Sequence, residues 1–285
     1  MRRGRWAGIA AGFAIVAAAA VTAGCGGGSG SALALDPVAA AATKTVQAGA
    51  ARVHFALSVS NPQLQGGRTI RLDGSGAIDG TSGQLAIGLG SLHRAGIPPN
   101  ATLQEIFLQQ DGDYVMYLGL GSLTSQLPGG KQWIELNVSK LGKSAGLDLG
   151  KLLSGSQFQP GDLLSMLRAE GAQIHKVGPA TIDGTATTHY RVTIDMAKAL
   201  EAKGLSSPLL AGVAAEVPSV PEDVWIGKDG LVHRIQLSVT AAQSRVAMTM
   251  DLYDYGADVS IAAPPSSEVF DATELAEQGL SGGLH

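Results

Sequence analysis

Apolar and polar side chains alternate with a period of two over much of the chain. In the range 51–60, the odd positions are apolar and the even positions are polar or small, beginning with Arg52 and His54. This alternation is typical of a β-strand with one buried side. Separated by turn signals such as Asn61-Pro62, similar runs predict about eleven strands: 51–60, 69–78, 85–89, 103–110, 114–118, 133–138, 172–177, 186–194, 223–227, 231–240 and 244–255.

Helical patterns interrupt the strands. Asp36 and Pro37 suit the first turn of a helix that ends before Gly49, because Asp caps a helix and Pro is tolerated at its first position. Pro160 and Asp162 suit another helix start. The predicted helical segments are 36–48, 140–153, 160–170, 196–203, 209–215 and 271–278.

So many adjacent antiparallel strands cannot stay flat, because strand twist accumulates and the sheet curls or closes. We therefore predict an α+β fold: a strongly curved antiparallel half-barrel sheet of about eleven strands, with helices packed on its concave face. Gly74 and Gly76 share the apolar side of their strand with Leu72. Glycines at such positions indicate a bend or the close approach of another group.

The first residues have the pattern of an export signal. Arg2, Arg3 and Arg5 precede an apolar run from Trp6 to Gly24, which is typical of a secretory signal peptide. The run is long enough to span a bilayer, so an uncleaved anchor helix is the alternative. Its end, Thr22-Ala23-Gly24-Cys25, resembles the lipobox of bacterial lipoproteins. That resemblance implies lipid attachment at Cys25, the single cysteine of the chain.

These features predict four segments. They are a lipoprotein signal peptide over 1–24, the lipidated Cys25 with a Gly/Ser tether over 25–34, a single domain over 35–278 and a loose tail over 279–285. Removing the signal with its three arginines changes the net charge from −4 to −7. An acidic chain without a dense Lys/Arg block is not expected to bind nucleic acid. We expect it on the extracytoplasmic side of the cell membrane, held by its lipid anchor.

Candidate catalytic groups are sparse. Gly142 to Gly146 matches G-x-S-x-G around Ser144, but a nucleophile elbow requires a strand before the serine in a parallel α/β sheet. No two histidines are three or four residues apart, and a single cysteine cannot form a multi-cysteine metal site. We therefore expect no enzyme activity, metal or cofactor. An exported hydrolase that uses Ser144 remains a weaker alternative.

The apolar side of the predicted sheet is the candidate binding surface. Its side chains could form a packed core or line a ligand cavity inside a half-closed sheet, and the pattern alone leaves both open. Methionine suits either, because it adapts to irregular surroundings. From periodicity, the candidate ligand-binding residues are Val53, Phe55, Leu57, Ile70, Leu72, Leu85, Ile87, Met116, Leu163, Met166, Leu167, Val192, Leu237, Met248 and Met250.

Over nearly its whole mature length, the chain resembles the LppX/LprA/LprF/LprG-type lipoproteins of actinobacteria, within the wider LolA/LolB-like group. After the lipobox and tether, the resemblance rests on loose signatures at 52–55, 177–184, 187–195, 221–227 and 232–235. It implies a curved antiparallel half-barrel with helices packed across it. It also implies a hydrophobic cavity that carries a lipid or acylated glycolipid across the cell envelope. Cys25 is the functional residue that the resemblance transfers.

Two functions follow as hypotheses. In the first, the protein is an envelope lipoprotein whose partners are a lipid or glycolipid and the membrane that holds its anchor. In the second, the same fold has a packed interior and acts as a sensory or interaction module, with an exposed apolar patch for an envelope protein partner.

Overall fold

The computed structural model describes residues 37–62, 69–80, 82–95, 97–121, 127–144, 173–202, 208–241 and 243–282. These residues form one 12-stranded sheet with the strand order β12-β6-β5-β4-β3-β2-β1-β11-β10-β9-β8-β7. The strands are β1 (Ala51–Ser60), β2 (Thr69–Asp79), β3 (Ser82–Gly88), β4 (Thr102–Gln110), β5 (Asp113–Gly119), β6 (Trp133–Asn137), β7 (Gln173–Ile182), β8 (Thr185–Asp195), β9 (Ser219–Gly227), β10 (Val232–Ala241), β11 (Ser244–Tyr253) and β12 (Val269–Asp271).

The helices lie between and after these strands. The α-helices are α2 (Pro37–Gln47), α3 (Val138–Ser144), α6 (Met196–Ala202), α7 (Pro208–Glu216) and α8 (Thr273–Gly282). Three short 3₁₀ helices are η2 (Gly90–Ala95), η4 (Pro128–Gly130) and η5 (Ser266–Glu268).

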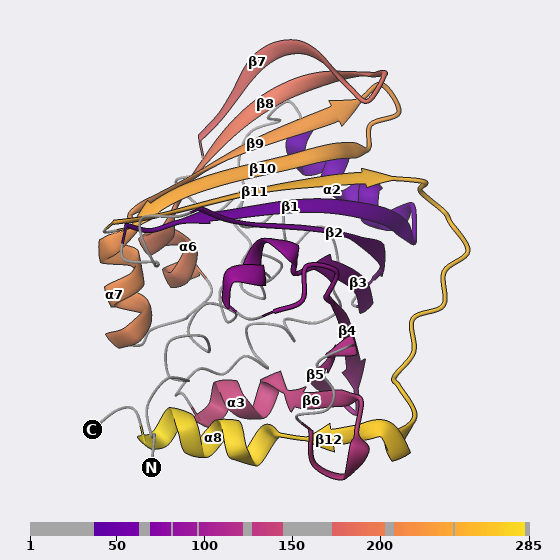
Figure 1. The fold of residues 1–285 in the computed structure, drawn as a ribbon. Coiled ribbons are helices and arrows are strands. Elements are labelled where there is room, and N and C mark those ends of the chain that lie inside the picture. Colours follow the sequence, from indigo (N-terminus) through magenta and orange to yellow (C-terminus); the bar gives the residue numbers. More distant parts are fainter. Residues whose placement is uncertain are drawn as a thin grey trace.

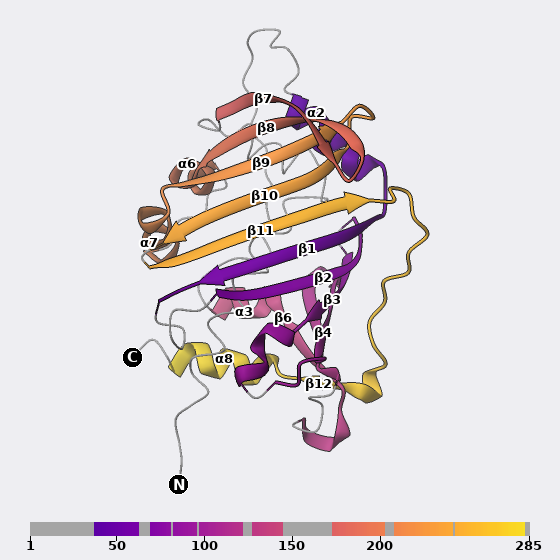
Figure 2. The ribbon, with the colours of Figure 1, turned by 45° about the horizontal axis from the view of Figure 1, so that its top comes forward.

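The sheet is strongly curved and open. Strands β7 to β2 form one broad layer, and β3 to β6 turn away from it toward α3 and α8 (Figure 1). The tilted view in Figure 2 shows the long, adjacent strands from β7 to β2. Neighbouring strands are antiparallel except β12, which pairs with β6 in parallel. The terminal strands β7 and β12 are not paired with each other, so the prediction of a curved, open and largely antiparallel sheet is confirmed.

The sequence predicted strands β1 to β11 but not all of their bounds; β3, for example, begins at Ser82, before the predicted start at Leu85. The strand predicted over 172–177 continues to Ile182, because a register shift between Lys176 and Gly178 carries β7 past the glycine and proline there. Strand β9 begins at Ser219, earlier than predicted, since Pro221 obscured its pattern. Strand β12 has three residues, too few to show a period.

The described helices agree with the predicted segments, with one correction and one gap. Helix α8 continues to Gly282, into the predicted loose tail, because a glycine such as Gly279 lowers helix stability without ending the helix. The helix predicted over 160–170 and the end of the one predicted over 140–153 lie outside the described residues.

Helix α2 packs on the sheet. Its buried residues are Val38, Ala39, Ala41 and Ala42, and they form one apolar cluster with sheet residues that include Val53, Val192, Val224 and Leu252. Alanine side chains let the helix backbone lie close to the strands. Helices α6 and α7 follow β8 and precede β9 at one end of the strands (Figure 1). Helices α3 and α8 contact each other beside β5 and β6.

Strands β4 and β5 are buried on both sides. One side carries the cluster of Ile106, Leu108, Val115 and Tyr117, against which Trp133, Ile261 and Val269 pack. The chain after β11 thus covers the outer side of this part of the sheet. Along the rest of the sheet, the apolar residues concentrate on the opposite, inner side.

The two glycines of β2 lie where other groups approach closely, as the sequence predicted. A Cβ atom on Gly74 would lie 2.2 Å from Cε1 of Phe55, and one on Gly76 would lie 1.9 Å from the backbone oxygen of Gln84. Both distances are far below van der Waals contact. The absence of a side chain at these two positions therefore allows β1, β2 and β3 to bend tightly.

Replacing Gly76 by alanine is expected to lower the free energy of unfolding by about 1–3 kcal/mol, because the added methyl group can only be accommodated by moving the backbone of β3. The matched control is Gly83→Ala in β3, where the nearest heavy atom would lie 3.8 Å away. Urea denaturation of both variants checks the difference. Equal stability of the two variants would contradict this account of the bend.

The apolar concave face as candidate functional site

The strand register places one set of side chains on the inner side of the sheet. In an antiparallel sheet, directly opposed residues point to the same side. Phe55 is opposite Met250 in β11 and Gly74 in β2, and Gly74 is opposite Ile87 in β3. We call this side the concave face: the odd-numbered residues of β1 from Ala51 to Val59, and the residues aligned with them across the sheet.

In Figure 1, η2 is the unlabelled purple coil beneath β1 and β2, and it lies inside the curve of the sheet. Leu92 of η2 and Ile97 pack against the cluster that contains Phe55 and Leu57. The side that bears Phe55 is therefore the inner, concave one. Helix α2 packs on the same side, since its cluster contains Val53.

The register brings together all the candidate ligand-binding residues that the structure describes. One continuous row contains Leu237, Met248, Leu57 and Leu72. Leu163, Met166 and Leu167 lie outside the described residues. The twelve candidates on the concave face are Val53, Phe55, Leu57, Ile70, Leu72, Leu85, Ile87, Met116, Val192, Leu237, Met248 and Met250.

The concave face is filled in some places and exposed in others. Phe55, Leu57 and Ile87 are buried in the cluster beneath η2. Met248 and Met250 in β11 are only partly buried, although they occupy the middle of the sheet. Met250 packs against the cluster of Val53, and Met248 packs against the cluster of Phe55. The face therefore combines buried side chains in β1 and β3 with partly buried methionines in β11, and an apolar ligand can lie on such a surface.

Two carboxylates interrupt this apolar surface. Glu222 in β9 is opposite Val192 and Leu237. Glu105 in β4 is opposite Leu85 and Leu118. The sequence pattern indicated neither carboxylate as a site residue. Within the described part of the chain, no hydrogen bond or ion pair links either side chain to another residue.

Burial controls the ionisation of both groups. It raises the pKa of Glu222 to about 7, with the nearby negative charge of Asp223 adding to the effect. Burial also raises the pKa of Glu105. An apolar environment disfavours the charged form of a carboxyl group. At neutral pH, Glu222 is therefore divided between its neutral and ionised forms.

Replacing Glu222 by glutamine is expected to stabilise the protein at pH 8 by about 2 kcal/mol and to have little effect near pH 4. The folded state binds the Glu222 proton more tightly than the unfolded state, whose pKa is near 4.5. Binding of this proton makes its full contribution to the free energy of unfolding below pH 4.5. That contribution is lost as the pH rises through about 7. Denaturation curves across this pH range check the result, with exposed Glu201→Gln in α6 as the control. If Glu222→Gln left the pH dependence of the free energy of unfolding unchanged, this prediction would be contradicted.

The opposite, convex side of the same strands is polar. Arg234 binds Asp251 through two nitrogen–oxygen contacts, one of 2.8 Å between Nη2 and Oδ2. Nε2 of His189 lies 2.7 Å from Oδ1 of Asp223, and the His189 ring stacks on Trp225 at 4.4 Å. His189 and Arg234 thus both find carboxylate partners on the sheet surface.

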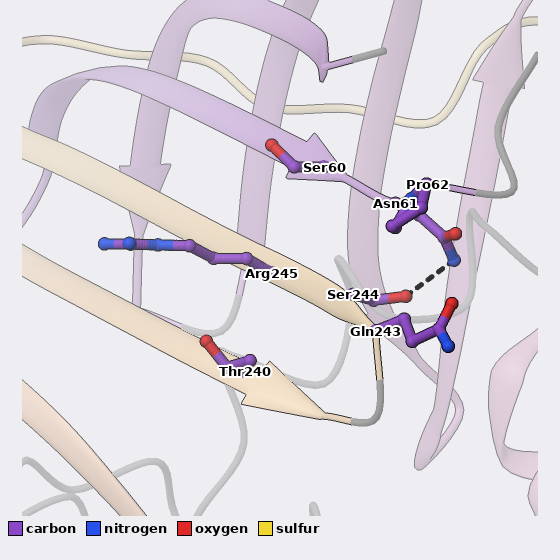
Figure 3. A pocket seen from close by; sticks show the side chains of 7 residues that line it. All are labelled: Ser60, Asn61, Pro62, Thr240, Gln243, Ser244 and Arg245. Atoms are coloured by element: carbon purple, nitrogen blue, oxygen red, sulfur yellow. Dashed lines mark hydrogen bonds between the residues drawn. The ribbon is translucent and has the colours of Figure 1, made fainter. Parts of the chain in front are cut away.

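A shallow hollow lies at the ends of β1, β10 and β11. Figure 3 shows its lining residues, among which Nδ2 of Asn61 donates a hydrogen bond of 2.7 Å to Oγ of Ser244. None of the twelve concave-face candidates lines it. The lining residues are Ser60, Asn61, Pro62, Thr240, Gln243, Ser244 and Arg245.

The predicted serine motif has no elbow geometry. Ser144 is the last residue of α3, and its Oγ donates a hydrogen bond of 2.7 Å to Oε1 of Glu277 in α8. The described residues contain no group of three His, Cys, Asp or Glu side chains placed to hold a metal ion. Among the helices that the structure describes, none has the length and apolar character needed to cross a membrane.

Comparisons with known proteins give distant similarities. No protein-family profile matches the chain. An uncharacterized 31.2 kDa protein from the rplA-rplJ intergenic region of Streptomyces griseus is 26% identical over 234 residues, which cover 75% of this chain and 73% of that protein.

Solved structures that are similar to this chain include LprF and the lipoprotein LppX. LprF from Mycobacterium bovis is 17% identical, with a TM-score of 0.41, and the similarity covers 84% of this chain and 100% of LprF. LppX from Mycobacterium tuberculosis is 16% identical, with a TM-score of 0.42, and it covers 80% of this chain and 100% of LppX. LprF and LppX are two of the lipoprotein types that the sequence resembles.

Proposed function

We propose that this chain is an envelope lipoprotein of the LppX/LprA/LprF/LprG type that binds a lipid or acylated glycolipid on its concave face, for transport or presentation across the cell envelope. The observation that carries the proposal is the register of the sheet. It aligns the twelve candidate side chains on one face of a strongly curved sheet and leaves Met248 and Met250 partly exposed there.

Burial of acyl chains on such a face supplies the binding energy. Each Å² of apolar surface removed from water contributes about 25 cal/mol, or about 0.8 kcal/mol per CH₂ group. Methionine side chains adapt their shape to ligands of different outline. Binding of this kind requires no catalytic residue, which agrees with a non-enzymatic carrier.

Lipid extraction tests the proposal. The segment 26–285, which lacks Cys25, is exported and purified without detergent. It is then extracted with organic solvent, and the extract is analysed by mass spectrometry. The expected result is about one lipid per protein, recovered from the purified chain. A lipid-free protein that also fails to bind fluorescent fatty acids would contradict the proposal and would favour the packed-interior interaction module.

Substituting Cys25 by alanine is expected to abolish acylation of the chain. The thiol is the group that takes the diacylglycerol, and Cys25 is the single cysteine. Incorporation of a labelled fatty acid into the protein in growing cells measures acylation directly. The control is Ser29→Ala, a substitution in the same tether. Undiminished labelling of Cys25→Ala would contradict attachment at this residue.

A further inference from the structure

We propose that Glu222 makes the concave face selective for amphiphiles with an uncharged, hydroxyl-bearing polar group, which hydrogen-bonds to the Glu222 carboxyl while the apolar chain lies along the neighbouring strands. This inference rests on the proposed function, because it names the class of ligand that the same face takes.

The surroundings of Glu222 leave its polar atoms without a protein partner in the described residues. Val192 and Leu237 lie directly opposite it, and Val220 and Val224 precede and follow it on the same side of β9. Glu222 is partly buried, and a carboxyl group that is shielded from water without a hydrogen bond costs free energy. A ligand that supplies the hydrogen bond recovers that cost, so the carboxyl favours ligands with a polar group at this place.

The charged side chains of β8, β9 and β10 that lie near Glu222 are directed to the other side of the sheet. Its neighbour Asp223 is on the convex side, where it pairs with Arg191 of β8 at 3.0 Å, and Arg234 of β10 pairs with Asp251 there. Tyr190 of β8 is the titratable residue that the register places on the concave side next to Glu222. The described residues of β8 and β10 thus present no cation to Glu222 on the concave face. On the same face, the edge strand β7 carries the exposed Lys176, opposite Tyr190 and two strands away from β9.

This arrangement distinguishes three kinds of polar group. A hydroxyl group can accept a hydrogen bond from the neutral carboxyl and donate one to the ionised carboxylate, so it pairs with either form. A fixed anion is repelled by the ionised form, and a fixed cation is attracted only by that form. Because the pKa of Glu222 is about 7, both forms occur near neutral pH, and a hydroxyl group is the partner that suits both.

Glu105 repeats the arrangement at the other side of the sheet. It is likewise on the concave face between apolar residues, Leu85 and Leu118. Strands β4 and β9 lie on opposite sides of β1 in the sheet order. Glu105 therefore offers a second carboxyl to a ligand with more than one hydroxyl group, and it is a secondary element of the proposal.

Photolabelling of the full chain in its own membranes tests the proposal. Three probes share one diazirine-containing alkyl chain and carry a glycerol, a sulfate or a trimethylammonium head. Labelling of the wild type, Glu222→Gln and the control Glu201→Gln is compared at pH 6 and pH 8. Glu201 is exposed in α6, and membranes without the protein correct for partitioning of each probe.

In the wild type and the control, the ratio of glycerol to sulfate labelling is expected to rise about tenfold from pH 6 to pH 8, because ionised Glu222 excludes the sulfate. In Glu222→Gln, the ratio should not change with pH. A pH-independent ratio in the wild type, or an unchanged rise in Glu222→Gln, would overturn the role of Glu222. Stronger labelling by the trimethylammonium probe than by the glycerol probe at pH 8 would overturn the ligand class.

The outcomes separate this inference from the proposed function. Labelling that is independent of Glu222 leaves a lipid-binding face and removes only the selectivity. Failure of all three probes to label the wild type above protein-free membranes contradicts both.

Discussion

Replacing Met248 by glutamate is expected to lower the amount of lipid that co-purifies with the protein at least tenfold. Met248 is in the middle of the sheet, between Leu57 and Leu237 on the concave face. A carboxylate there must be desolvated when an acyl chain covers it, and a cost of about 1.4 kcal/mol already corresponds to a tenfold loss of affinity. Quantitative mass spectrometry of the solvent extract measures the loss.

The adjacent residue provides a matched control. Thr249 precedes Met250 in the same strand but points to the convex side, opposite Ala56 and Gln236. Thr249→Glu therefore adds the same charge without touching the proposed ligand. It should retain lipid at the wild-type level. Uncharged Met248→Gln, which disturbs folding less, should lose an intermediate amount. Wild-type lipid content in both Met248 variants would contradict the assignment of the concave face.

Replacing Phe55 by alanine is expected to lower the free energy of unfolding by about 3–5 kcal/mol. Phe55 is 4% exposed, and its ring lies over Gly74, where a Cβ atom would be 2.2 Å from Cε1. Removing the ring leaves a cavity that β2 cannot fill, since Gly74 has no side chain. Denaturant unfolding of residues 26–285 measures the change.

The control for this prediction is the preceding residue, His54. Its side chain is 50% exposed on the convex side, 3.9 Å from Asp251. His54→Ala should change the stability by no more than about 0.5 kcal/mol, as is usual for exposed positions. A loss of less than about 1 kcal/mol in Phe55→Ala would show that the concave side of β1 is not the core described here.

The period-two pattern predicted much of the fold because one side of most strands is buried and the other is polar. In β1, this contrast identified both the strand and the side on which Val53, Phe55 and Leu57 lie. The pairing of β1 with β11 joins residues about 190 positions apart and has no local signal in the sequence. The structure therefore adds the strand order, and with it the row that unites Leu57 with Met248.

The two carboxylates show why parts of the site could not be predicted. Around Glu105, apolar residues occur at both odd and even positions. Leu103 is on one side of β4 and Ile106 is on the other, because β4 is buried on both faces. In β9, the alternation of apolar and polar positions is hidden by Pro221 and by the adjacent acids Glu222 and Asp223. Which of two neighbouring acids points inward depends on pairing with β8 and β10.

Mapping the attachment sites of a photoreactive fatty acid shows directly whether lipid binds on the concave face. The full chain is labelled in its own membranes, purified and digested, and each modified residue is identified by mass spectrometry. We expect adducts on concave-face residues such as Leu57, Leu237 and Met248, and an excess of unlabelled lipid should abolish them. Adducts confined to convex residues such as His54 and Thr249, or a chain without specific adducts, would contradict the claim that the concave face binds lipid.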